Sequence, residues 1–117
     1  MSDYLRIPEL TTHQPIPDDG ILTRVLRNDT VCKIVLFTMS AGQELSEHTA
    51  SVPATMHFVS GAGAVTLGAD AYDYRANAWI SMTPGLAHSI RADTPTTMLL
   101  TMYKSSANPQ RPKGEDA

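Results

Sequence analysis

The chain has 117 residues, of which 42% are hydrophobic, and its formal net charge is −3 with a pI near 5.7. This length suits one domain with one core, and the weakly acidic balance lacks the basic surface that nucleic acid or an anionic membrane attracts. No apolar run approaches the ~20 residues of a membrane helix. We therefore expect one globular domain whose partners are neither nucleic acid nor a membrane.

The two ends of the chain differ in composition from the middle. Residues 1–19 contain three prolines, which block a regular β-ladder, and are predicted to form an arm. Residues 104–117 are polar and rich in proline, and are predicted to be a flexible tail. The first residues lack the charged and apolar regions of a signal peptide. Because Cys32 is the only cysteine, no intramolecular disulfide is expected, and the protein is predicted to be cytoplasmic.

Between these ends, residues 20–103 consist of short β-prone runs separated by turn residues. We expect strands at 21–27, 31–39, 45–49, 54–60, 63–67, 71–75, 78–83, 86–91 and 96–103. No window sustains the 3.6-residue period of a helix. Short strands spaced by roughly 8–12 residues are typical of a β-sandwich or β-barrel. The pattern therefore predicts a single all-β domain.

Three side chains in these strands have simple structural interpretations. Cys32 lies in an apolar run, where it is either a small core side chain or a reactive thiol. Met98, Leu100 and Met102 share one face of the last strand, which indicates flexible core packing and not a methionine metal site. Trp79 is interpreted as strand packing or as a contact between subunits.

Two stretches carry a more specific pattern. In the first, Gly42 is followed after five residues by His48 and later by Gly61; in the second, Gly85 is followed after two residues by His88. Together they resemble the two conserved motifs of the cupin family, in the same order and separated by a predicted hairpin. The resemblance covers roughly residues 20–103. It implies an antiparallel double-stranded β-helix, or jelly-roll barrel.

The departures from the family pattern concern the metal ligands. The family site takes three ligands from the first motif and one from the second. Here Ala50 stands in place of the second histidine and Ala54 in place of the glutamate, so only His48 and His88 match ligand positions. A four-ligand zinc site is worth about 10–16 kcal/mol, so the loss of two ligands costs about 10⁴–10⁶ in affinity. The resemblance then implies weak or absent binding of a divalent transition metal, unless a third ligand is recruited.

Three side chains are candidates for that third ligand. His57 is the first, although strand alternation places it outward and Met56 and Phe58 inward, unless a bulge reverses the faces. Glu47 immediately precedes His48 and should face the other way. Glu44 lies in the approach to the same strand.

The barrel interior is the predicted ligand-binding site. Its candidate residues are expected to face inward or to leave space there: His48, His88, Met56, Phe58, Ala50 and Ala54. Two polar anchors in an apolar cup are a common form for a small-molecule site. The alternative is that both histidines are structural, each held by hydrogen bonds.

These observations leave three hypotheses for function. The first is a small cupin barrel that binds a small molecule around His48 and His88 with weak or absent metal. The second is a metal-dependent enzyme, similar to cupin dioxygenases or isomerases, with a recruited third ligand. The third is a structural or partner-binding domain. Small cupins resemble one another in forming dimers, and open sheet edges invite pairing, so a homodimer is expected.

Overall fold

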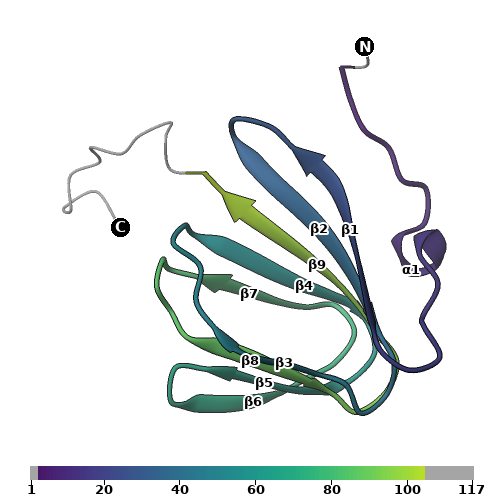
Figure 1. Ribbon diagram of the computed structural model, residues 1–117, viewed down its shortest axis with the longest axis vertical. Helices are drawn as coiled ribbons and strands as arrows, with labels where there is room; N and C mark the ends of the chain where they lie inside the picture. Colours follow the sequence, from purple (N-terminus) through teal and green to yellow (C-terminus); the bar gives the residue numbers. More distant parts are fainter. Residues whose placement is uncertain (1–2, 105–117) are drawn as a thin grey trace.

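A computed structural model describes residues 3–104 and shows two antiparallel β-sheets that face each other (Figure 1). The strands are β1 Ile21–Asn28, β2 Cys32–Met39, β3 Glu44–His48, β4 Ala54–Ser60, β5 Gly63–Leu67, β6 Asp70–Tyr74, β7 Ala78–Met82, β8 His88–Ala92 and β9 Thr96–Tyr103. All nine predicted strands are confirmed, with ends that differ by at most two residues. The predicted antiparallel jelly-roll architecture is also confirmed.

The strand order explains how distant segments meet. The five-stranded sheet has the order β1-β2-β9-β4-β7, and the four-stranded sheet has the order β3-β8-β5-β6. Every neighbouring pair is antiparallel. Because β3 pairs with β8, the two halves of the sequence that carry the histidines lie side by side at one edge of the four-stranded sheet.

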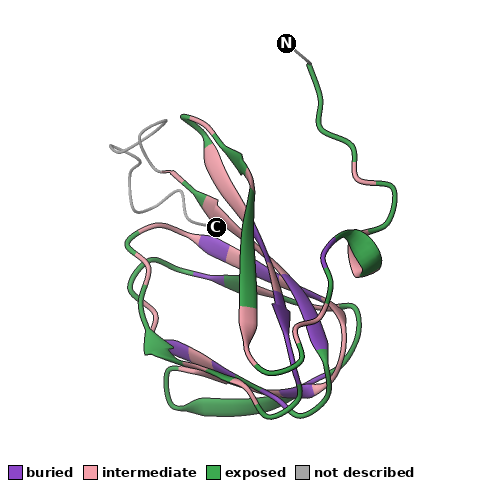
Figure 2. Ribbon diagram, turned by 45° about the vertical axis from the view of Figure 1, so that its right-hand side comes forward, coloured by how far each residue is buried: buried purple, intermediate pink, exposed green. Residues whose placement is uncertain are grey.

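The core fills the space between the sheets, where the buried segments of both sheets lie (Figure 2). Alternate residues of β4, including Met56 and Phe58, point into it. Phe58 stacks on Tyr74 with ring centroids 3.9 Å apart. The Tyr74 hydroxyl forms a buried 2.8 Å hydrogen bond with Thr96, and burial raises the pKa of this phenol. Each fully buried apolar side chain of this kind contributes about 1.5–3 kcal/mol.

The arm contains a single helical turn, α1, at Leu10–His13. The sequence predicted no helix, and this turn is too short to show the periodicity by which helices are recognised. Just after it, Gln14 is buried, and its Nε2 donates to the carbonyl of Leu22 at 3.1 Å and to Thr38 Oγ1 at 2.9 Å. Thr38 Oγ1 in turn donates to the carbonyl of Pro15 at 2.8 Å, so these side chains together fasten the arm to the five-stranded sheet.

Two further expectations concern the cysteine and the chain ends. Cys32 is partly buried at the start of β2. The Lys104 ammonium donates to Asn28 Oδ1 at 2.7 Å, and the rest of the predicted tail lies outside the described residues.

Within residues 3–104, no helix is both long enough and apolar enough to cross a bilayer.

Candidate functional site

His48 and His88, which come from the two sequence motifs, meet between the sheets. They are register partners on β3 and β8. Their ring centroids lie 4.3 Å apart at an interplanar angle of 60°. His88 is 4% exposed, whereas His48 is exposed and lies at the solvent side of the pair.

A β-bulge in β3 makes this meeting possible. Leu45 pairs with Ile90 and His48 pairs with His88. Between these two pairs, β3 therefore advances by three residues and β8 by two. In a regular strand, residues three apart face opposite sides of the sheet. The extra residue of the bulge shifts the in–out alternation of side chains by one residue, so that Leu45 and His48 both face the interior.

Main-chain hydrogen bonds determine the tautomer of both rings. His48 Nδ1 lies 2.9 Å from the carbonyl oxygen of Ser46, and His88 Nδ1 lies 2.9 Å from that of Leu86. A carbonyl oxygen only accepts, so Nδ1 carries the hydrogen in each ring. In the neutral rings, both Nε2 atoms then bear a free lone pair.

The two histidines line a small pocket of about 80 Å³. The remaining wall is apolar and comes from both sheets: Phe37, Leu45, Met56, Ile90, Met98 and Leu100. Among residues 3–104, no charged side chain lines the pocket, and the two histidines are the only polar side chains in the lining. The pocket is thus an apolar space with two adjacent imidazoles as its recognition groups.

The structure separates the other predicted ligand-binding residues into two groups. Met56 lines the pocket. Phe58 and Ala54 are buried in the core and do not line the pocket. Ala50 lies in the loop after β3, where its carbonyl accepts a 2.8 Å hydrogen bond from the Gly85 amide.

Five pocket residues were absent from the predicted ligand-binding set: Phe37, Leu45, Ile90, Met98 and Leu100. The shared face of Met98 and Leu100 was visible as alternation in the sequence. What was not visible was that β9 would lie beside β4, because that neighbourhood depends on the jelly-roll path.

None of the candidate third ligands joins the histidine pair. His57 pairs with Leu99 and Trp79, whose side chains lie on the outer face of the five-stranded sheet. Glu44 and Glu47 lie on the outer face of the four-stranded sheet. Across residues 3–104, no three His, Cys, Asp or Glu side chains converge as a metal-binding group. Residues 3–104 therefore do not fit the four-ligand metal centre that the resemblance to cupins implied.

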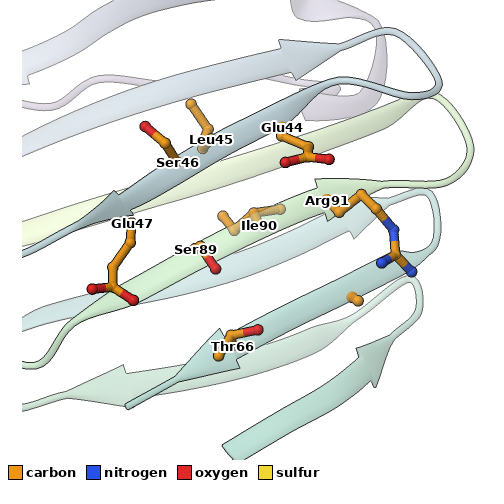
Figure 3. Close-up of a pocket in the computed structure, with 9 residues that line it drawn as sticks. Glu44, Leu45, Ser46, Glu47, Thr66, Ser89, Ile90 and Arg91 are labelled. Atoms are coloured by element: carbon orange, nitrogen blue, oxygen red, sulfur yellow. The ribbon is translucent and has the colours of Figure 1, made fainter. Parts of the chain in front are cut away.

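A second, polar groove lies on the outer face of the four-stranded sheet (Figure 3). It measures about 340 Å³ and carries the carboxylates of Glu44 and Glu47 beside the hydroxyls of Ser89 and Thr66. Its guanidinium, from Arg91, is already paired with Asp93 at 2.9 Å, outside the groove lining. The groove faces solvent and offers no buried polar group, so the interior pocket is the better-defined site.

Comparisons with known proteins identify the fold. No family model and no curated protein sequence matches the chain. A conserved protein of unknown function from Streptococcus pyogenes is 26% identical, with 88% of this chain and 90% of that chain covered and a TM-score of 0.78. An RmlC-like cupin from Desulfovibrio desulfuricans is 22% identical, with 86% and 98% covered and a TM-score of 0.76. Salicylate 1,2-dioxygenase from Pseudoaminobacter salicylatoxidans, in adducts with gentisate, is 15% identical, with 79% and 27% covered and a TM-score of 0.67.

Proposed function

Because the chain folds as a small cupin domain, we propose that it binds a small molecule in the pocket between its sheets, with His48 and His88 as the polar anchors. The observation that carries this proposal is the pairing of two imidazoles, each with a free Nε2, at the wall of an otherwise apolar pocket. Small-molecule sites commonly combine an apolar lining with a few convergent polar groups.

The hydrogen bonding of His88 favours binding over a purely structural role. A structural histidine in a core usually has its polar atoms satisfied by the protein. His88 is buried, yet only its Nδ1 has a hydrogen-bond partner within residues 3–104. Among the described residues, Thr97 Oγ1 is the side-chain atom that is both buried and without a hydrogen-bond partner, so Nε2 of His88 is not sealed in the core, and a ligand or water in the pocket can reach it.

One observation favours metal-dependent chemistry as a second candidate function. Metal-binding histidines usually donate their other ring N–H to a carbonyl or carboxylate, and both His48 and His88 do so. Two imidazoles alone leave a metal with too few protein ligands. The enzyme alternative, similar to a dioxygenase or isomerase, therefore needs a third ligand from outside the described residues, such as a substrate.

Elemental mass spectrometry separates the two candidates. The protein is purified without a histidine tag and its metal content is measured per mole of chain, before and after addition of iron, zinc, manganese, nickel or copper. The binding proposal expects metal far below one equivalent in both samples. One equivalent of a single metal, lost in the His48→Ala/His88→Ala variant but retained in His57→Ala, would instead support the enzyme.

We also propose that the protein acts in the cytoplasm as a homodimer. The single cysteine is consistent with a reducing compartment. The edge strand β1 supports the dimer, because it carries the exposed apolar side chains Leu22 and Val25. Exposed edge strands readily pair with a second chain.

A further inference from the structure

We infer that the ligand of this pocket is an uncharged molecule that presents hydrogen-bond donors to His48 and His88 and buries a short apolar end beside them. This inference rests on the proposed function, because it names the chemical class that the same pocket recognises. It follows from the polarity of the two rings, the absence of charge in the lining and the size of the pocket.

The polarity of the site is determined by the protein backbone. Each Nδ1–H is engaged by a carbonyl oxygen at 2.9 Å, so each neutral ring offers only a lone pair at Nε2. With the ring centroids 4.3 Å apart, one small head group can reach both rings. A head group with two donors, such as a 1,2-diol or a primary amide, satisfies both lone pairs, whereas a group that only accepts satisfies neither.

The lining disfavours charged ligands of either sign. A carboxylate or phosphate would place its oxygens against two lone pairs, and no lysine or arginine of the described residues 3–104 lines the pocket to balance it. An ammonium group would donate well but would find no carboxylate there. Burial of an unpaired charge is far more costly than burial of a hydrogen-bonded neutral group. The glutamates of the outer groove lie on the other face of the sheet.

The size of the pocket limits the buried end of the ligand. Its volume of about 80 Å³ is about half that of a cavity that holds benzene. The innermost wall includes flexible methionines, Met56 and Met98, which adapt to a short alkyl group. Because His48 is exposed, the remainder of a larger ligand can extend past it into solvent. We therefore expect an end of three or four carbons inside the walls.

A matched set of fragments tests the inference. The probes are 1,2-butanediol, butyramide, 2-butanone, butyrate and butylamine, which vary the head group on a similar short chain. Binding is followed at pH 8 by NMR shifts of the methionine methyls and of the imidazole nitrogens. We expect the diol and the amide to bind at least ten-fold more tightly than the other three, with the largest nitrogen shifts at Nε2.

Two variants show whether the histidines cause this preference. His48→Phe keeps an aromatic ring but removes one acceptor, so the preference for the diol over 2-butanone should fall at least three-fold. His57→Phe makes the same change on the outer face of the other sheet and should leave the preference unchanged. The spectrum of each variant reports whether it is folded.

The possible failures are distinguishable. Butyrate or butylamine binding as tightly as the diol, with shifts at the same methionines, would overturn the inference and leave the proposed function standing. A preference for the diol over 2-butanone that is the same in His48→Phe as in the parent protein would also overturn the inference. If none of the five probes shifts any pocket resonance, the proposed binding function fails together with the inference.

Discussion

His48 faces His88 across β3 and β8 only because two residues of β3, Ser46 and Glu47, are set against the single Ser89 of β8. The bulge therefore changes which face of the sheet the residues of β3 on either side of it point to. It brings Leu45 and His48 to the same face, although they are three residues apart. The recognition groups of the pocket thus depend on the local count of residues as well as on their identity.

This geometry predicts an unusual tolerance to deletion. Removal of Glu47 alone should convert the bulge into a regular ladder and keep His48 opposite His88. Removal of both Ser46 and Glu47 should turn either Leu45 or His48 away from the interior. We expect fragment binding within about three-fold of the parent for the single deletion and a loss of at least ten-fold for the double deletion, measured by NMR titration. Equal effects of the two deletions would contradict the role given to the bulge.

A second prediction concerns the unequal burial of the two histidines. His88→Ala removes a buried ring and its Nδ1 hydrogen bond, so it should lower the free energy of unfolding by about 2 kcal/mol. His48→Ala, at an exposed position, should cost under about 1 kcal/mol. Urea denaturation measures both. If His88→Ala does not fold, His88→Phe keeps most of the volume and provides the comparison; a larger loss in His48→Ala would refute the assignment of burial.

The sequence determined the strands well because alternation and turn residues are local signals. The sequence also located His48, His88 and Met56, because the two motifs and the alternation of inward and outward residues in β4 can be recognised without a structure. The bulge in β3 and the pocket contributions of Phe37 and Leu45 could not be read in this way. They depend on which strands become neighbours, and that is decided by the path of the whole chain.

Gly63, at the start of β5, and Gly42, in the loop between β2 and β3, are predicted to differ in their tolerance of a side chain. A Cβ added at Gly63 would collide with the carbonyl oxygen of Arg91 and approach the Tyr74 ring to 2.8 Å, whereas one at Gly42 would meet no atom within 4 Å. Gly42 has a φ of +87°, so its replacement costs only backbone strain. We expect Gly63→Ala to destabilise by over about 3 kcal/mol and Gly42→Ala by about 1 kcal/mol. Thermal unfolding of both variants measures the two losses of stability. A larger loss in Gly42→Ala than in Gly63→Ala would contradict the prediction.

The turn between β1 and β2 predicts a contribution to acid sensitivity. Amides of Cys32 and Val31 donate to Asp29 at 2.9 and 2.8 Å, Arg27 donates at 2.8 Å, and these bonds hold the pKa of the Asp29 carboxyl well below its usual range. A carboxyl with a lowered folded-state pKa stabilises the fold above its unfolded pKa of about 3.9, and that stabilisation is lost as the pH falls. Asp29→Asn should therefore be less stable at pH 7, with a smaller further loss between pH 5 and pH 2. Urea midpoints of the parent and of Asp29→Asn are measured across this pH range. If stability falls with pH equally in both proteins, the prediction is contradicted.

The edge strand β1 predicts how the proposed homodimer is broken. Leu22 is 41% exposed and Val25 is 52% exposed, which are high values for apolar side chains on a strand of eight residues. Unpaired edges are normally protected by charge or by a bulge, and β1 has Arg24, Arg27 and a register shift between Val25 and Arg27. If β1 pairs with a second copy, Leu22→Glu with Val25→Glu should give a folded monomer, because buried unpaired carboxylates oppose association.

Light scattering coupled to size-exclusion chromatography measures the mass of the parent and of this variant. The matched control is Tyr72→Glu on β6, an edge strand of the other sheet with a similarly exposed apolar side chain. It should remain a dimer, because the change lies on a different edge. A monomeric parent at high concentration would end the dimer proposal. A dimer disrupted equally by Tyr72→Glu would move the interface from β1 to the four-stranded sheet.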